Sequence, residues 1–400
     1  MSLSAPGRFG CCDKYAFGTT CDVHDGDNTA HRTADRSGAR LTERVRRSTS
    51  FATGNFASTG GLPIRADALS AHTVGWMRAI VCRSFGPLED LVIEERPSDG
   101  LPAGHVRVRV TAAGVNFVDA LLVQGLYQIK PPLPFVAGGE SVGIVSEVAA
   151  GVVAPAVGDR VLVASGAGGF ATEMITAADR VWIVPPLLTD GQAATFMQSY
   201  MTAFFALARR AKLERGQSLL VLGAGGGVGL AAVDVGRALG LRVLAAASSV
   251  DKRRVAMSRG AAATIDSSTE DVKTRARELS GGDGVDAVYD PVGGTLGEEC
   301  LRALRDDGQF IVIGFASGDI PRLPANHVLL RNRRVTGVDW GGWVARNAAA
   351  NQEMVADVVA MIAAGELDPV EPLSYPFDDA ARALADQQHR KVVGKAVLIP

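Results

Sequence analysis

The sequence has few cysteines, and their scarcity excludes a class of small, disulfide-stabilised proteins. Five of the 400 residues are cysteine: Cys11, Cys12, Cys21, Cys82 and Cys300. This scatter supports no disulfide framework, so we expect a reducing, cytoplasmic compartment. Three of the cysteines lie near His24, which leaves a metal knuckle as an alternative, although their spacing matches no established zinc pattern.

Long apolar runs and an excess of either charge are also missing. No apolar run reaches the roughly eighteen residues that a membrane-spanning helix needs. Lys and Arg number 41 against 43 Asp and Glu, so the net charge is −2, which favours neither nucleic acid nor an anionic membrane as a partner. With 47% hydrophobic and 21% charged residues, the composition is typical of a globular protein, and the length allows two or three domains.

Residues 1–76 lack a sustained apolar period and are rich in Ser, Thr, Gly, Arg and Ala. Such a segment buries too little surface to offset the entropy of ordering it, so we interpret it as a disordered tail. It has no apolar core of a secretory signal, and its acidic residues argue against a transit peptide. We hypothesise that Met77 is the true start. Mass spectrometry that finds the intact tail on native protein would contradict this.

From Met77 onward the chain is expected to form two domains. Short strands separated by Gly and Pro predict a β-rich, barrel-like domain over 77–198, followed by a helix over 190–210. Alternating strands and helices over 199–338 predict a doubly wound α/β domain with a parallel sheet. Residues 339–400 carry two helices and a last strand without a sheet of their own, so we expect them to return to the first domain. The predicted strands of the α/β domain are 219–222, 242–247, 263–265, 285–289 and 309–313, and its predicted helices are 228–239, 251–259, 270–279 and 295–303.

A glycine cluster, Gly223 to Gly229, joins the first of these strands to the first helix. Glycines allow a tight turn and a close approach of backbone to a pyrophosphate, and the helix N-terminus presents free N–H groups to it. Gly226 and Gly229 fit the second and third positions of the G-x-G-x-x-G fingerprint, whereas Ala224 occupies the first. The strand and helix on either side supply the context that this motif requires. A turn without a ligand is the alternative. The predicted phosphate-binding residues are Gly223, Gly226, Gly227, Val228 and Gly229.

The end of the second strand favours NADPH over NADH. An NAD site usually has an Asp or Glu here for the ribose 2′-hydroxyl. This chain instead has Ser248 and Ser249, followed by Lys252, Arg253 and Arg254. Hydroxyl and basic groups bind a 2′-phosphate, and no carboxylate repels it. The alternative is that the basic run forms a solvated helix face.

Several motifs in order resemble the quinone oxidoreductase branch of the medium-chain dehydrogenase/reductases, and the resemblance covers Met77 to Pro400. It implies a Rossmann domain inserted in a GroES-like catalytic domain, with the active site between them and, in many relatives, a homodimer that pairs edge strands of the coenzyme sheet. Residues 310–313 are expected near that edge. The motifs are 111–119 (TAAGVNFVD), 125–127 (GLY), 133–135 (LPF), 138–140 (GGE), 223–229, 290–294 (DPVGG), 330–332 (LRN), 340–341 (WG) and 394–395 (GK).

The same resemblance implies roles for single residues. Asn116 would orient the acceptor and nicotinamide, with an N-cap as its alternative role. Asp119 would steady neighbouring polar groups or the helix start, and Tyr127 would donate a hydrogen bond or proton, with a half-buried structural aromatic as its alternative. Lys395 would reach the coenzyme phosphate, unless it lies in a surface turn. The other expected coenzyme contacts are Thr202, Ser267 (where relatives often have Tyr), Gly314, Phe315, Ala316 and Arg390.

Zinc ligands of the related alcohol dehydrogenases are missing from their positions. Asn116 stands where those enzymes have Cys, Gly139 stands where they have His, and residues 165–179 contain no Cys for a structural zinc lobe. We therefore predict no metal site.

The predicted function is NADPH-dependent hydride transfer to a quinone without a metal ion, because such an acceptor needs no Lewis acid. Reduction of an α,β-unsaturated carbonyl or enoyl thioester is an alternative. A non-catalytic NADPH-binding scaffold is a second alternative.

Overall fold

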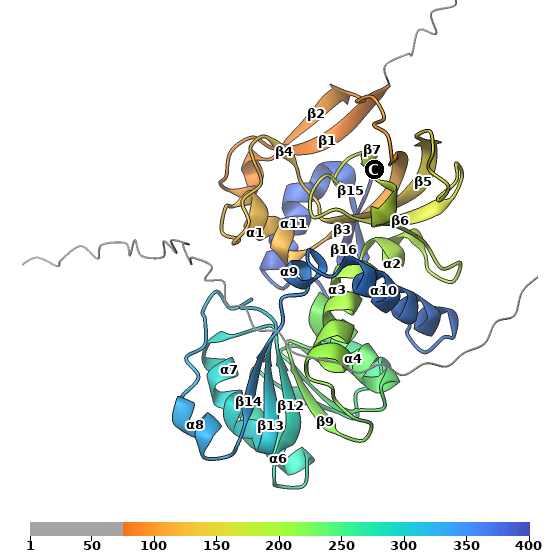
Figure 1. Ribbon diagram of the computed structural model, residues 1–400. Coiled ribbons are helices and arrows are strands. Elements are labelled where there is room, and N and C mark those ends of the chain that lie inside the picture. Colours follow the sequence, from red (N-terminus) through yellow and green to blue (C-terminus); the bar gives the residue numbers. More distant parts are fainter. Residues whose placement is uncertain (1–74) are drawn as a thin grey trace, which may run out of the picture. The chain divides into compact units, whose positions relative to one another are not determined.

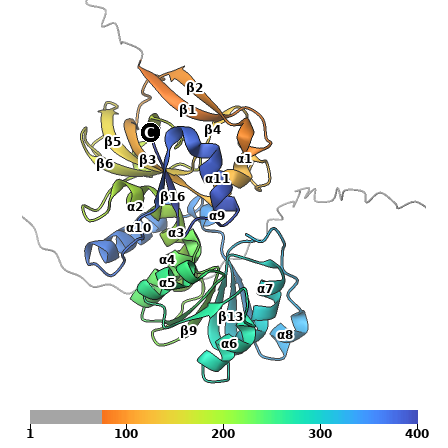
Figure 2. The same cartoon turned by 180° about the vertical axis from the view of Figure 1, so that it is seen from behind.

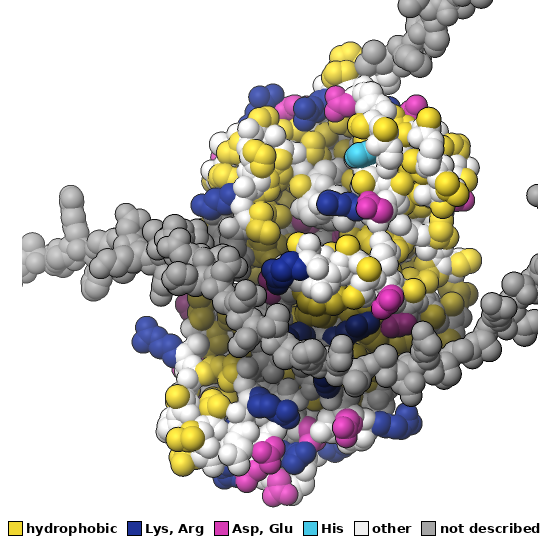
Figure 3. Space-filling view, in the orientation of Figure 1, with side chains coloured by type: hydrophobic (Ala, Val, Ile, Leu, Met, Phe, Trp, Pro, Cys, Tyr) yellow, Lys and Arg dark blue, Asp and Glu magenta, His cyan; other side chains and the backbone are white. Residues whose placement is uncertain are grey.

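The computed structural model describes residues 75–400, and they contain a parallel and a largely antiparallel sheet (Figure 1). The predicted tail and the possible metal knuckle near His24 lie outside the described residues. On the face in Figure 3, acidic and basic side chains are interspersed with hydrophobic ones. No helix within residues 75–400 has the length and apolar character needed to cross a membrane.

The parallel sheet has six strands in the order β11-β10-β9-β12-β13-β14. The order reverses between β9 and β12, which is the arrangement of a doubly wound fold, and the predicted fold class is therefore confirmed. Its strands are β9 (Ser218–Leu222), β10 (Arg242–Ala247), β11 (Ala263–Asp266), β12 (Val285–Asp290), β13 (Leu304–Val312) and β14 (Arg334–Gly337). Its helices are α4 (Gly227–Ala238), α5 (Val250–Ser258), α6 (Val272–Leu279), α7 (Gly294–Cys300) with the short η4 (Leu301–Ala303), and α8 (Ala325–Leu329).

Both faces of this sheet are buried, which explains the continuous apolar runs of its strands. Leu219 and Val221 of β9 point into one hydrophobic cluster, while Leu220 and Leu222 point into another on the opposite face. Figures 1 and 2 show α4 and α7 on opposite sides of the sheet. A parallel sheet covered by helices on both faces has no polar side to alternate with the apolar one.

The second large sheet has seven strands, in the order β15-β16-β3-β5-β6-β8 with β7 paired to β3. A separate three-stranded sheet has the order β2-β1-β4. The strands are β1 (Trp76–Cys82), β2 (Val92–Pro97), β3 (His105–Val115), β4 (Phe135–Val136), β5 (Glu140–Val148), β6 (Arg160–Ala164), β7 (Glu173–Ala177), β8 (Val181–Ile183), β15 (Leu373–Pro376) and β16 (Ala396–Ile399). The remaining α-helices are α1 (Phe117–Val123), α2 (Asp190–Ala194), α3 (Phe196–Phe204), α9 (Trp340–Val344), α10 (Ala348–Ala363) and α11 (Ala380–Gln388).

The C-terminal strand β16 pairs antiparallel with β3, so the end of the chain joins the sheet built by its beginning. Just before β16, Gly394 forms a parallel bridge with Gly226 at the start of α4. The segment 390–395 therefore contacts both the seven-stranded sheet and the glycine turn of the parallel sheet. This connection positions the candidate site.

One prediction about the elements needs correction, and one about the sheet edge is refined. The helix expected over 190–210 is divided at Thr195, whose hydroxyl donates to the Gly191 carbonyl (3.0 Å), and it ends in a π-helical segment, η3 (Phe205–Arg210). Residues 310–313 lie near the sheet edge, as expected, but do not form it. Residues 310–312 belong to β13, which β12 and β14 flank on both sides, and the edge strand is β14.

Candidate active site

The glycine turn follows the carboxyl end of β9 and leads directly into α4. Gly223 has φ +60°, a left-handed conformation that favours glycine. A Cβ atom on Gly229 would lie 2.2 Å from the Gly223 carbonyl oxygen, so no larger residue fits without moving backbone. The helix begins at Gly227, with Gly226 as its N-cap. The turn thus has the tight backbone and exposed helix start that a pyrophosphate needs.

Lys252 lies across this turn and is not part of a solvated helix face. A Cβ atom on Gly225 would lie 2.4 Å from both Cβ and Cγ of Lys252, so the aliphatic stem packs on the glycine backbone. Its Nζ donates a hydrogen bond to the Arg390 carbonyl oxygen (2.6 Å). Ser249 is the N-cap of α5 and accepts the Lys252 backbone N–H at 3.3 Å.

The other two residues of the basic run point elsewhere. Arg253 forms an ion pair with Asp266 (3.0 Å), at the end of β11, and donates to the Ala247 carbonyl oxygen (3.1 Å). Arg254 forms an exposed ion pair with Asp251 at 3.1 Å. Of the three consecutive basic residues, Lys252 is therefore the one that contacts the glycine turn.

Lys252 and Arg390 bring two positive charges to the end of β10. Burial lowers the pKa of Lys252, and the positive charge of Arg390 lowers it further. The Arg390 guanidinium donates to the Ala316 carbonyl oxygen (2.8 Å), which ties it to the loop after β13. Ser248, which directly follows β10, is exposed. Ser267 is half-buried, and its backbone N–H donates to the Ala247 carbonyl oxygen at 3.3 Å. This donor set fits a ribose 2′-phosphate.

The loop after β13 contains Gly314, Phe315 and Ala316. The Ala316 N–H donates to the Pro291 carbonyl (3.0 Å), and Phe315 is 37% exposed. On the other side of the glycine turn, Thr202 is half-buried in α3, and a Cβ atom on Gly227 would lie 3.4 Å from the Ser199 hydroxyl of the same helix. These expected coenzyme contacts all lie on elements that adjoin the carboxyl ends of the parallel strands.

A buried polar network lies where the two sheets meet. Lys395 donates through Nζ to the side-chain oxygen of Asn116 and approaches Glu140 Oε1 at 3.3 Å. Glu140 Oε2 also accepts the Gln198 backbone N–H (2.9 Å). Asn116 is 4%, Glu140 1% and Lys395 9% exposed. A lysine with these partners does not lie in a surface turn, so that alternative for Lys395 is wrong.

Lys395 also touches the glycine turn, because a Cβ atom on Gly227 would lie 2.5 Å from Lys395 Cδ. The aliphatic stem therefore runs along the start of α4, while the ammonium group reaches Asn116 and Glu140. Sequence reasoning missed Glu140 as a member of the site. The motif 138–140 (GGE) contains this residue, but no role of its own was assigned to it from the sequence.

Asp119 supports the network from the first turn of α1. Its Oδ2 accepts the backbone N–H of Asn116, the N-cap of that helix, at 2.8 Å. Burial raises the pKa of Asp119 to about 7, against the opposing effects of the Asn116 N–H and the charge of Lys395. Two atoms of this buried network, Asp119 Oδ1 and Asn116 Nδ2, have no hydrogen-bond partner among residues 75–400. The Asn116 amide group thus has N–H donors available to a bound molecule.

Tyr127 is half-buried beyond the end of α1 and is not hydrogen-bonded to Asn116, Asp119 or Lys395. Burial raises the pKa of its phenol, and the negative charge of Asp339 raises it further. Asp339 is the N-cap of α9, so this helix brings it near Tyr127. The phenol is therefore protonated at neutral pH.

Side chains that could bind a metal ion are not clustered in the described part of the chain. Within residues 75–400, no group of three or more His, Cys, Asp or Glu side chains is placed to hold a metal ion. Cys82 and Cys300 are both buried, and Cys82 donates to the Ser84 carbonyl oxygen at 3.3 Å. The absence of zinc from this protein stays a prediction.

Comparison with known proteins gives two family matches and close relatives. Residues 102–186 match the alcohol dehydrogenase GroES-like domain, and residues 227–363 match the zinc-binding dehydrogenase family. Quinone oxidoreductase-like protein 2 homolog of Nematostella vectensis is 37% identical over 325 residues, covering 80% of this chain and 88% of that protein.

Two solved structures are informative. Escherichia coli quinone oxidoreductase complexed with NADPH is 30% identical with a TM-score of 0.73, covering 81% of this chain and all of that one. The CurK enoyl reductase is 25% identical with a TM-score of 0.73, covering 81% of this chain and 99% of that one. The GroES-like and Rossmann parts of the predicted fold are confirmed by these matches. This chain therefore belongs to the quinone oxidoreductase branch of the medium-chain dehydrogenase/reductase superfamily.

Proposed function

We propose that this chain is an NADPH-dependent oxidoreductase that reduces a quinone by hydride transfer without a metal ion. The observation that carries the proposal is the position of the Lys395 side chain. Its aliphatic stem packs on Gly227, and its ammonium group donates a hydrogen bond to Asn116. One side chain thereby connects the phosphate-binding turn to the polar group proposed to face the acceptor.

The coenzyme proposal rests on the residues around the glycine turn. The turn would hold the pyrophosphate. Lys252 with Arg390 would hold the 2′-phosphate, because both cations lie at the end of β10, where Ser248 and Ser249 follow the strand in place of an acid. When bound, NADPH supplies a hydride to the acceptor, which also takes up one proton, so that a quinone becomes a hydroquinone and NADP⁺ is left. The E. coli relative, whose structure contains NADPH, supports this choice.

Asn116 is proposed to orient the acceptor. Its side-chain oxygen is occupied by Lys395, which fixes the amide so that Nδ2 is the end left to donate a hydrogen bond. An N–H donor aimed at the acceptor oxygen stabilises the negative charge that develops there on reduction. Tyr127, protonated at neutral pH, is proposed to supply the proton, and Asp119 is proposed to hold the Asn116 backbone.

Reduction of an activated alkene is a second candidate, favoured by the similarity to the CurK enoyl reductase. Both reactions would use the same coenzyme and the same Asn116 donor. They differ in the atom that receives hydride, since ene reduction forms a new C–H bond at carbon.

The test compares a para-quinone, a small enone and an enoyl thioester as acceptors for the full chain, with NADPH deuterated at the transferred position. Fast turnover of the quinone, with no deuterium retained on carbon, supports quinone reduction. Preference for the enone or thioester, with deuterium at the β-carbon, overturns it in favour of ene reduction. NADPH binding without turnover of any acceptor contradicts both and favours a non-catalytic scaffold.

We also propose a cytoplasmic homodimer that pairs the β14 edges of two parallel sheets. Val335 in this edge strand is 46% exposed, and the adjacent Leu329 and Leu330 are 76% and 74% exposed. Apolar side chains beside an unpaired strand edge favour association with a second copy. Analytical ultracentrifugation of the chain and of Val335→Arg tests this, because a dimer that persists in the variant contradicts pairing through β14.

A further inference from the structure

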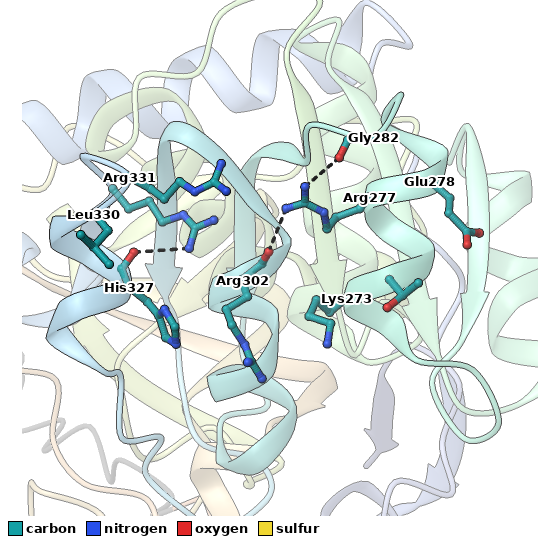
Figure 4. Close-up of a pocket in the computed structure, with 10 residues that line it drawn as sticks. Lys273, Arg277, Glu278, Gly282, Arg302, His327, Leu330 and Arg331 are labelled. Carbon is teal, nitrogen blue, oxygen red and sulfur yellow. Dashed lines mark hydrogen bonds between the residues drawn. The ribbon is translucent and has the colours of Figure 1, made fainter.

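A cavity of about 650 Å³ lies between α6, η4 and the segment from α8 to β14 (Figure 4). None of its lining residues belongs to the candidate active site. Arg302 and Arg333 stand just before β13 and β14, at the amino ends of the parallel strands, whereas the glycine turn follows the carboxyl end of β9. The cavity and the coenzyme site therefore lie at opposite ends of the strands.

The lining of this cavity is strongly basic. It includes five cationic side chains and one carboxylate, Glu278. The cations are Lys273, Arg277, Arg302, Arg331 and Arg333. Glu278 is already paired with Arg275 outside the lining, at 2.7 Å. Lys273 and Arg331 pair with acids outside the lining, Asp271 at 3.5 Å and Asp306 at 2.8 Å.

Three of the guanidinium groups have no carboxylate partner. Arg277 donates to the carbonyl oxygens of Gly282 (2.8 Å) and Arg302 (3.5 Å), as Figure 4 shows. Arg333, only 7% exposed, donates to backbone carbonyls, including that of His327 (3.3 Å). No ion pair formed within residues 75–400 includes Arg277, Arg302 or Arg333.

Positively charged side chains lie close to one another in this cavity. Burial lowers the pKa of Arg333, and the positive charges of Arg331 and Arg277 lower it further. The Arg302 side chain makes no hydrogen bond to the rest of the described chain, so all its donors are available. Guanidinium groups that line one cavity without carboxylate partners favour the binding of an anion there.

The size and the remaining lining indicate the kind of anion. A volume of about 650 Å³ is within the range of small-molecule sites and far exceeds what a single phosphate fills. The His327 ring and the Leu330 side chain add planar and apolar surface to the lining (Figure 4). This cavity opens to solvent, and its volume admits a compact organic anion.

We propose that this cavity binds a small organic diphosphate, with the charged groups held by Arg277, Arg302 and Arg333 and the organic part beside His327 and Leu330. Planar guanidinium groups bind phosphate oxygens through two parallel hydrogen bonds, and several such groups together select a multiply charged anion over a single phosphate.

The test is calorimetric titration of the full chain with ADP, pyrophosphate and adenosine, in saturating NADPH so that the coenzyme site is occupied. We expect ADP to bind, pyrophosphate to bind more weakly, and adenosine not to bind. Arg302→Ala should weaken ADP binding about tenfold, since it removes charge-assisted hydrogen bonds. Arg242→Ala, which removes an exposed arginine outside the cavity in the same sheet domain, should leave the affinity unchanged.

Failure of both ADP and pyrophosphate to bind the NADPH-saturated chain would overturn the proposal. Equal loss of affinity in Arg302→Ala and Arg242→Ala would also overturn it, because it would indicate attraction to the surface in general. Circular dichroism checks that each variant folds. If Arg302→Ala does not fold, Arg302→Gln replaces it, with the same expected loss. An effect of NADPH concentration alone on ADP binding would assign it to the coenzyme site instead.

Discussion

Replacing Lys395 by methionine is expected to damage stability and hydride transfer for separate reasons. Methionine keeps the length of the stem that packs on Gly227 but removes the ammonium group that contacts both Glu140 and Asn116. Glu140 is 1% exposed and would keep only the Gln198 N–H as a partner.

The size of the stability loss follows from this geometry. Opposite charges 3.3 Å apart attract by about 5 kcal/mol at an effective dielectric constant of about 20. In the wild-type protein, part of this attraction offsets the cost of removing the two charged groups from water. After the substitution the Glu140 carboxylate is still removed from water, but the attraction that offset this cost is lost. Breaking a buried pair in this way costs roughly 3–5 kcal/mol.

Stability is measured as the shift in the urea midpoint, and catalysis as kcat for NADPH-dependent reduction. The double variant Lys395→Met with Glu140→Gln removes the unpaired charge, so it should regain most of the lost stability. It should not regain kcat, because Asn116 still lacks the donor that fixes its amide. A single variant that unfolds at the wild-type midpoint, or a double variant that recovers full kcat, would refute the reasoning.

Three further outcomes are expected. Lys252→Ala should raise the KM for NADPH about tenfold or more and leave the KM for NADH unchanged. Arg254→Ala, on the same helix but exposed, should change neither KM. Equal effects of Lys252→Ala on both coenzymes would contradict the 2′-phosphate role. Gly229→Ala should abolish NADPH binding because its Cβ would lie 2.2 Å from a backbone oxygen, and Gly100→Ala, which meets nothing within 4 Å, is its neutral control in the same binding titration. Burial raises the pKa of the Asp119 carboxyl from 3.8 to about 7, so the folded state binds the carboxyl proton more tightly than the unfolded state. The folded state therefore loses stability as the pH rises from about 4 to about 7, on the order of 4 kcal/mol in total. Asp119→Asn, which carries no titrating proton, should lose less between pH 5 and pH 8 in denaturant titrations, and an identical pH dependence in both proteins would argue against this account.

The parallel sheet was predictable from the sequence because its strands are buried on both faces. Continuous apolar runs such as Leu219–Leu222, followed by glycines and a helix, have few other interpretations. The edge strand β14 was not recognised, since Arg334–Gly337 is short, half-exposed and without an apolar run. The prediction therefore placed residues 310–313 near the edge without identifying the strand that forms it.

The buried network was predictable only in part. Asn116 and Asp119 stand three residues apart at a helix start, a spacing visible in the sequence. Lys395 joins them from a position 279 residues away, and local patterns carry no information about such a contact. A lysine between glycine and a short strand has the usual surroundings of a surface residue, and only the pairing of β16 with β3 brings it inside.

The central claim is that this chain passes hydride from NADPH to a quinone without a metal ion. The most direct test is steady-state reduction of a para-quinone by the full chain after exhaustive chelation, with NADPH and NADH compared at equal concentration. We predict undiminished turnover after chelation and a kcat/KM for NADPH about tenfold or more above that for NADH. Turnover that vanishes with chelation and returns with zinc, or equal use of the two coenzymes, would contradict the account.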